Sequence, residues 1–494
     1  MKYYIIDAFT TQPFGGNPAG VVLLDGNAFP EESLMLQIAA ELRYSETAFI
    51  RRHSPNEFTI RYFTPKAEVE LCGHATIASF HLLHRKGLAS GTCKCHTLAG
   101  TLNIEVDDRV MMQMASPRVL QTIDDPREVY QALGLPDYQP SLPVKVVTTG
   151  LPDLMIQIPD TQTLQQLHPD MDAVARYTEK TNTVSFHVFA FDNDGHTAHV
   201  RDFAPLYGVP EESATGTANA ALTHYLQQVG CLGSTAECTF LQGEAMGRPS
   251  VIATQIRPDG SIYVGGSACI LAEGELNPPI FSSLKKYIEE EIIPRYDHFD
   301  QAHQRDHVLM VIKQSMELAE KYNADRNLAY TIAAFHDTGI CEGREHHHEV
   351  SARIVHEDPH LPYWFSPEQI DLIAEAVEDH RASSTRTPRS LYGRIVADAD
   401  RFIDPETIVR RTIQYGLDHY PELSREEQYQ RMLTHLHEKY GRGGYLKLWF
   451  TDSPNAVRLE QLHQMIEDEN AMRTLFNNII PTTDIASLQD ATTT

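Results

Sequence analysis

Residues 208–218 read Gly-Val-Pro-Glu-Glu-Ser-Ala-Thr-Gly-Thr-Ala, and a shorter counterpart, Cys-Gly-His-Ala-Thr, stands at residues 72–76. Both stretches place small residues where a loop is expected to turn into a helix, and they lie about 140 residues apart. This faint duplication predicts two related lobes in the first half of the chain.

Short β-rich runs alternate with helical stretches around these two motifs. The β-rich runs are 3–7, 19–24, 101–106, 187–191 and 261–266, and the helical stretches include 31–43 and 218–228. The alternation predicts an α/β or α+β fold.

A turn-rich stretch, Glu-Gly-Glu-Leu-Asn-Pro-Pro at residues 273–279, ends the β signal, and the apolar spacing is helical from there to about residue 478. We therefore expect an α+β domain followed by an all-α domain. The expected boundaries are a first domain at 1–277, a linker at 278–294, a helical domain at 295–480 and a flexible tail at 481–494.

The charge and the cysteine content narrow the class of protein. The 494 residues include 41 Lys and Arg against 67 Asp and Glu, a net charge of −26 that repels nucleic acid and anionic membranes. No apolar run has the roughly 18 residues of a membrane span. Seven cysteines, odd in number and sparse, suit reduced thiols. We expect a soluble, cytoplasmic protein with neither nucleic acid nor membrane as a partner.

Glycines at the start of helices expose backbone N–H groups, and the helix dipole favours an anion there. Two such junctions facing each other would hold a small carboxylate, although each alone is also typical of a tight packing turn. Glu46, in Ser45-Glu46-Thr47, lies at an element boundary beside apolar residues. It is a candidate general acid or base, with helix capping or solvent exposure as the alternatives.

A set of motifs runs in order through the first 275 residues: Phe14-Gly15-Gly16-Asn17-Pro18-Ala19-Gly20, Ser45-Glu46-Thr47, Cys72-Gly73-His74-Ala75-Thr76, the stretch at 208–218, Gln242-Gly243 and Gly247-Arg248-Pro249-Ser250. In this order they resemble the PhzF family of phenazine-biosynthesis-like isomerases. The resemblance implies two similar lobes, each a sheet around a central helix as in diaminopimelate epimerase, with the active site in the cleft between them. It also implies a homodimer.

The resemblance assigns roles within this cleft. Glu46 would move a proton at carbon without a cofactor, assisted by His74 and Glu212, on a small anionic metabolite. The residues implied in substrate binding are Asn17, Gly73, Thr215, Gly216 and Thr217. The chain departs from the family at Glu212-Ser213, where Asp-Pro is usual. The longer carboxylate is expected to shift the pocket, so the resemblance does not extend to phenazine-pathway chemistry.

Cysteine chemistry is the rival mechanism for the first domain. Related epimerases and proline racemases use two opposed thiols, and Cys72 resembles the first of them. The opposite motif, Ser213-Ala214-Thr215-Gly216, offers no second thiol. We interpret Cys72 as structural, or as a wall of the pocket.

Histidines and aspartates recur in the helical half. His307 opens one predicted helix and His336-Asp337 closes the next, with a turn near residues 323–325 between them. Two antiparallel helices of this length would bring His307 beside His336. Imidazole and carboxylate together suit first-row transition metals, although a single histidine on an apolar face is more often part of the core.

The ordered His, His-Asp, Asp set resembles the HD superfamily of metal-dependent phosphohydrolases over roughly residues 295–410. The resemblance implies His307, His336, Asp337 and Asp400 as ligands of a first divalent metal ion (Fe, Mn, Co or Zn), with His347 and His380 beside a second. His303, Asp398, His346 and His348 remain alternative ligands. A nearby group of arginines is a candidate grip for the phosphate of a phosphorylated small molecule or nucleotide, or else a solvated basic loop: Arg344, Arg381, Arg386, Arg389 and Arg394.

These predictions combine into a bifunctional enzyme, an isomerase-like domain fused to a phosphohydrolase-like domain. The alternative is that only one half is catalytic and the other is a binding or dimerisation module.

Overall fold

The computed structural model describes residues 1–300, 303–381, 386–401 and 403–480, so the tail expected at 481–494 lies outside the described residues. The chain divides into two compact units, Met1–Leu276 and Asn277–Thr494.

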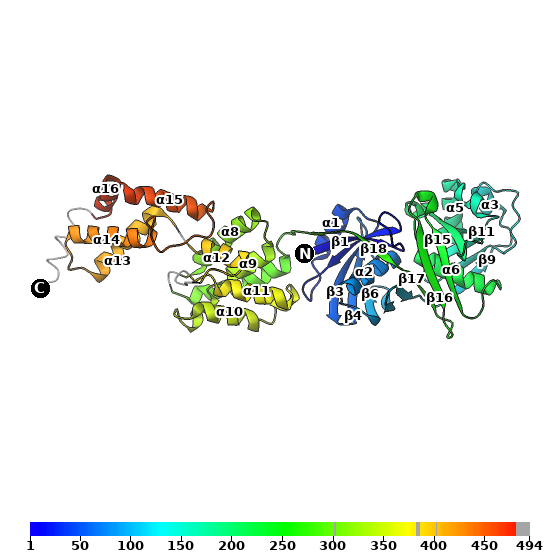
Figure 1. The fold of residues 1–494 in the computed structure, drawn as a ribbon, viewed down its shortest axis with the longest axis horizontal. Coiled ribbons are helices and arrows are strands. Elements are labelled where there is room, and N and C mark those ends of the chain that lie inside the picture. Colours follow the sequence, from blue (N-terminus) through cyan, green and yellow to red (C-terminus); the bar gives the residue numbers. More distant parts are fainter. Residues whose placement is uncertain (301–302, 382–385, 402, 481–494) are drawn as a thin grey trace. The chain divides into compact units, whose positions relative to one another are not determined.

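In the first unit, one hydrogen-bonded ladder of strands wraps around two helices (Figure 1). The first lobe surrounds α2 (Gly73–Arg85) with β1 (Lys2–Ala8), β2 (Asn17–Leu23), β3 (Thr47–Ser54), β4 (Glu57–Phe63), β5 (Glu68–Val69), β6 (Gly91–Thr97), β7 (Gly100–Val106) and β8 (Val110–Gln113). The second lobe surrounds α6 (Gly216–Gln228) with β9 (Arg118–Thr122), β10 (Lys145–Thr148), β11 (Pro152–Gln157), β12 (Ser185–Ala190), β13 (Ala198–Ala204), β14 (Val209–Glu212), β15 (Ala236–Gln242), β16 (Ser250–Ile256) and β17 (Ile262–Gly266). The prediction of two related lobes, each a sheet around a helix, is confirmed.

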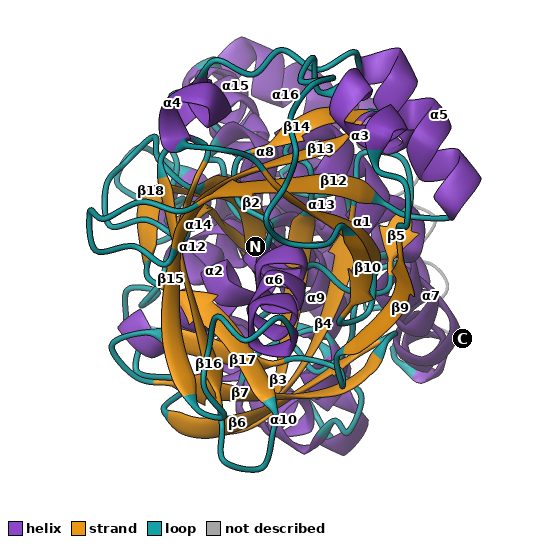
Figure 2. Ribbon diagram, turned by 90° about the vertical axis from the view of Figure 1, so that its right-hand side faces the viewer, coloured by secondary structure: helices purple, strands orange, loops and turns teal. Residues whose placement is uncertain are grey.

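The strands of the two lobes pair with each other between β8 and β17, and the last strand then completes the first lobe. β8 runs antiparallel to β17, with Met112 opposite Val264. β18 (Ala268–Glu275) returns to pair with β1, with Cys269 opposite Asp7. Figure 2 shows β10, β12, β15 and β16 curving around α6.

Small side chains on the central helices let the strands approach closely. Ala218, Ala220 and Ala221 of α6 are fully buried. The outer faces are covered by α1 (Glu32–Leu42), α3 (Arg127–Ala132), α4 (Thr161–Gln165) and α5 (Met171–Thr181). Because α6 lies on one face and α3–α5 on the other, β12 and β13 are buried along their whole length.

The second unit is helical throughout its described residues. Its elements are α7 (Ser282–Tyr287), α8 (Arg305–Lys321), α9 (Arg326–Phe335), α10 (His347–Glu357), α11 (Pro367–Glu378), α12 (Leu391–Ala399), α13 (Pro405–His419), α14 (Arg425–Tyr440), α15 (Pro454–Glu467) and α16 (Glu469–Ile479). Many helix starts follow the expected chemistry: Asp325 caps α9, and Ser366 caps α11 in a reciprocal capping box with Gln369.

The expectation of a linker at 278–294 is wrong. These residues contain α7 and a π-helical turn at Ile288–Ile292, and Leu284, Ile288 and Ile292 are fully buried in the core formed by α8–α12. An apolar residue every four positions is a helical pattern, and burying three such side chains stabilises the unit by several kcal/mol, about 1.5–3 kcal/mol for each.

The helices after residue 403 pack around a separate core that includes Val409, Tyr429 and Phe476. None of the helices in the described residues is both long and apolar enough to cross a bilayer.

Candidate active site and candidate metal centre

Glu46 and His74 meet at the edge of the first lobe. Glu46 lies between α1 and β3, with its side chain 22% exposed, and its Oε2 is 3.4 Å from Nε2 of His74. His74, the second residue of α2, is 5% exposed. The predicted acid–base residue therefore faces the predicted histidine rather than bulk solvent.

The neighbours of the His74 ring place its proton. Nε2 faces the Glu46 carboxylate, which can only accept, so the neutral ring carries its proton on Nε2, while Nδ1 lies 3.4 Å from Sγ of Cys72. The two amide hydrogens of Asn17 go to Glu212 and to the carbonyl oxygen of Ala214, each at 3.0 Å. Burial lowers the pKa of His74 despite the opposing effect of the Glu46 carboxylate. His74 is thus a neutral donor to Glu46 at pH 7.

Glu212, at the end of β14, approaches the same place from the second lobe. Its Oε1 accepts a hydrogen bond of 3.0 Å from Asn17, and its Oε2 lies 2.9 Å from Oγ1 of Thr215. Burial, followed by the charges of Asp202 and Glu46, raises the pKa of Glu212 to about 8. Glu212 is therefore protonated at neutral pH.

The starts of the two central helices offer unused N–H groups. Gly73 begins α2 and Gly216 begins α6, and neither helix has a side-chain cap. Thr217 is the second residue of α6. Free N–H groups at two helix N-termini suit a small carboxylate.

Cys72 is poorly suited to act as a base. Its Sγ is buried 3.4 Å from Nδ1 of His74. Burial and the neighbouring Glu46 raise the pKa of the Cys72 thiol well above its usual value, so the thiolate is strongly disfavoured.

Asp202 is a buried carboxylate next to Thr215 that the sequence alone did not indicate as part of the site. Oδ2 of Asp202, on β13, lies 3.0 Å from Oγ1 of Thr215, and its Oδ1 accepts from Ser185 and pairs with His187. The single hydroxyl hydrogen of Thr215 satisfies only one of Asp202 and Glu212 at a time. The available signal was the pair of adjacent charged residues, Arg201 and Asp202, within a strand that is otherwise mostly apolar.

The helical half brings its predicted ligands together. His307, in the first turn of α8, lies beside His336, which follows α9, and their Nε2 atoms are 3.2 Å apart. This is the antiparallel arrangement predicted from the spacing. Oδ1 of Asp400, after α12, lies 3.2 Å from Nε2 of His307 and 3.7 Å from Nε2 of His336.

Asp337 divides its two oxygens between two sets of histidines. Its Oδ2 lies 3.4 Å from His307 and 3.2 Å from His336, whereas its Oδ1 lies 3.4 Å from His347 and 3.3 Å from His380. Donor atoms bound about 2.1 Å from one ion are themselves about 3.0–3.4 Å apart. The donor set therefore fits divalent metal ions at two neighbouring positions, with Asp337 shared between them.

The Nδ1 nitrogens of three of these histidines form hydrogen bonds with backbone carbonyl oxygens. Nδ1 of His336, His347 and His380 lies 2.8, 2.8 and 2.5 Å from the backbone oxygens of Ala333, Arg344 and Val377. A histidine that donates from Nδ1 presents Nε2 as a metal ligand. Burial alone would raise the pKa of Asp337, but the surrounding imidazoles lower it well below its usual range, so a charged carboxylate is available.

The alternative ligands make contacts outside the two sets of donor atoms. His303 pairs with Asp300, His346 is 64% exposed, and His348 lies beside Glu349 and Arg381. Asp398 is fully buried, and its Oδ2 accepts from the backbone N–H groups of Trp449 and Phe450.

The arginines do not form one group. Arg344 pairs with Asp300, and Nη1 of Arg381 donates to the carbonyl oxygen of Glu345 at 2.5 Å, next to the second histidine set. Arg386 and Arg389 both pair with Asp379. Arg344 and Arg381, which lie beside His347 and His348, remain the candidates for binding the phosphate of a substrate.

Asp398 is expected to stabilise the fold without holding metal. Asp398→Ala leaves the N–H groups of Trp449 and Phe450 without their acceptor, which should cost about 1–3 kcal/mol of unfolding free energy. Denaturant unfolding measures the loss of stability, and elemental analysis measures the metal content. A variant that loses metal but keeps its stability would contradict this assignment. Asp400→Ala is the matched comparison, because Asp400 belongs to the metal donor set.

Comparisons with known proteins agree with this division of the chain. The family model described as phenazine biosynthesis-like protein matches residues 6–274, and the HD domain model matches residues 305–403. An uncharacterised isomerase of Deinococcus radiodurans is 34% identical over 295 residues, which cover 55% of this chain and 94% of that protein. An uncharacterised isomerase of Escherichia coli is 33% identical, covering 56% and 97%. The crystal structure of a PhzF-family phenazine biosynthesis protein from Bacillus anthracis matches with a TM-score of 0.52 and 25% identity, covering 56% of this chain and 98% of that one.

Proposed function

Because the chain belongs to the phenazine biosynthesis-like (PhzF) family over residues 6–274 and carries an HD domain over residues 305–403, we propose that it is a bifunctional enzyme. The first half moves a proton within a small anionic metabolite, and the second half hydrolyses a phosphorylated small molecule or nucleotide.

The contact between the Glu46 carboxylate and neutral His74 supports the isomerase activity. The N–H groups at the starts of α2 and α6 hold the carboxylate of the substrate. Glu46 takes a proton from carbon, the electron pair of that bond passes into the conjugated part of the substrate, and the neutral Glu212 carboxyl gives a proton at a second position. The two glutamates finish with exchanged protonation states, which solvent exchange restores.

The pH dependence follows from Glu212, the proton donor. Below about pH 8 this carboxyl holds its proton, and above that value kcat/KM should fall about tenfold per pH unit because the donor is lost. A pH profile of isomerisation measures this limb. Glu212→Gln should be slow, and its residual rate should lack the limb; a limb that persists in this variant would assign it to another group.

The division of Asp337 between two histidine sets supports the hydrolase activity. Six residues would hold two divalent ions: His307, His336, Asp337, Asp400, His347 and His380. Bound there, such ions supply positive charge that stabilises attack on a phosphoryl group. Arg381 orients the phosphate of the substrate. Phosphate release from a panel of phosphomonoesters and nucleotides, after reconstitution with Fe²⁺, Mn²⁺, Co²⁺ or Zn²⁺, tests this half.

A homodimer is the proposed assembly, on the strength of the family resemblance. Sedimentation should then give twice the chain mass of 55.7 kDa.

A further inference from the structure

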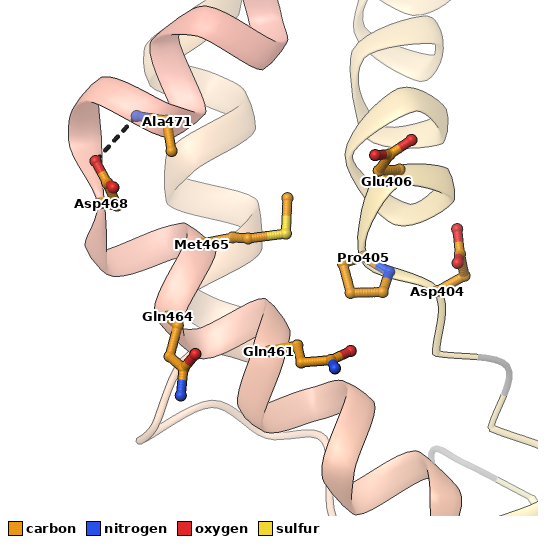
Figure 3. A pocket seen from close by; sticks show the side chains of 8 residues that line it. All are labelled: Asp404, Pro405, Glu406, Gln461, Gln464, Met465, Asp468 and Ala471. Carbon is orange, nitrogen blue, oxygen red and sulfur yellow. Dashed lines mark hydrogen bonds between the residues drawn. The ribbon is translucent and has the colours of Figure 1, made fainter.

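The helices after residue 403 hold two hollows that these activities do not use. One lies between the start of α13 and α15–α16 (Figure 3), has a volume of about 550 Å³ and is lined by Asp404, Glu406 and Asp468 among others. Asp404 and Asp468 accept hydrogen bonds from the backbone of the helices they cap. Helix capping accounts for their placement, so this hollow indicates no ligand.

The second hollow, which we call the α13–α14 pocket, has the opposite charge. Its volume is about 350 Å³. It is lined by Thr407, Ile408, Arg411, Thr412, Tyr415, Arg431, His435, Lys439 and Tyr440. No acidic residue lines it.

The cations of the α13–α14 pocket lack carboxylate partners. Among the described residues, no ion pair includes Arg411, Arg431 or Lys439. Such a cluster is unusual in a chain with a net charge of −26, because the many acidic residues would be expected to neutralise it. Three neighbouring cations repel each other, and an anion between them relieves this repulsion.

Arg431 is held in place by contacts with a backbone carbonyl oxygen and an aromatic ring, not with a carboxylate. Its guanidinium donates to the carbonyl oxygen of Thr412 and lies 6.0 Å from the ring centre of Tyr415. A cation that is fixed before a ligand arrives loses little entropy on binding.

Tyr415 gives the α13–α14 pocket an aromatic side. It is 50% exposed, and one face of its ring stacks on His419 at 4.0 Å between ring centres. A stacked but half-exposed ring beside cations suits a molecule that carries both a planar group and phosphate.

We propose that the α13–α14 pocket binds a phosphorylated small molecule, with a diphosphate between Arg411, Arg431 and Lys439. The volume lies at the low end for ligand pockets, which favours one small molecule. None of the lining residues belongs to the metal cluster or to the proposed active site of the first half, so this is a separate ligand site.

Calorimetric titration of the full chain with inorganic pyrophosphate, and separately with ADP, tests the proposal. A chelator removes metal ions first, so that phosphate cannot bind through them. Arg411→Gln with Lys439→Gln should weaken binding at least about tenfold, because each removed cation loses a charge-assisted contact. Arg410→Gln with Lys447→Gln makes the same charge change outside the pocket and should bind like the unaltered chain.

The outcomes separate the sources of the phosphate. Tighter binding of ADP than of pyrophosphate supports a nucleotide, and equal affinities support the diphosphate group alone. Absence of saturable binding of both probes at millimolar concentration overturns the proposal, as does equal weakening in the two double variants.

Discussion

Replacing His336 and Asp337 together by alanine should remove both metal ions from the helical half. Asp337 contributes an oxygen to each histidine set, so its loss affects both positions, and His336 removes a further donor from one of them. Elemental analysis should fall from about two ions per chain to near zero, and phosphoester hydrolysis should fall at least about a thousandfold.

His303→Ala is the matched control, because His303 lies near the cluster but pairs with Asp300. It should keep the metal content and the activity. His347→Ala should lose mainly one ion, since His347 belongs to the histidine set at Oδ1 of Asp337 and not to the set at Oδ2. Full metal content in the double variant would rule out the assigned ligands. Unaltered protein that stays inert toward phosphoesters after reconstitution would instead favour a binding module in this half.

Glu46→Gln should abolish proton exchange in the first half. An amide does not accept the proton that the carboxylate takes from carbon, so deuterium uptake from heavy water into a substrate acid should fall about a hundredfold to ten-thousandfold. Mass spectrometry or NMR of a panel of small carboxylic acids measures the uptake. The shape of the side chain and its contact with His74 are largely retained.

Cys72→Ser separates this mechanism from thiol chemistry. The thiol is buried with a raised pKa, so the serine variant should retain most of the exchange. Exchange that survives Glu46→Gln but disappears in Cys72→Ser would reverse the assignment.

Local patterns in the sequence predicted much of this arrangement. The spacing of His307 and His336 required only two helices and a turn, and the small residues at 72–76 and 215–218 marked the starts of both central helices. These features depend on neighbouring residues, which a sequence displays directly.

Features that depend on distant contacts were harder to predict. Asp398 and Asp400 stand two positions apart near the end of one helix and so point in different directions. Only the packing of Trp449 and Phe450, some fifty residues later, decides which of them faces the histidines. The role of Asp202 and the burial of Leu284, Ile288 and Ile292 likewise follow from tertiary packing.

The pairing of β8 with β17 limits how the two lobes of the first half can move. The lobes share backbone hydrogen bonds along this seam, so pulling them apart as separate bodies would break several of these bonds at once. The space between the lobes can therefore widen only by a hinge about this seam or by local rearrangement of side chains and loops, both of which keep these bonds.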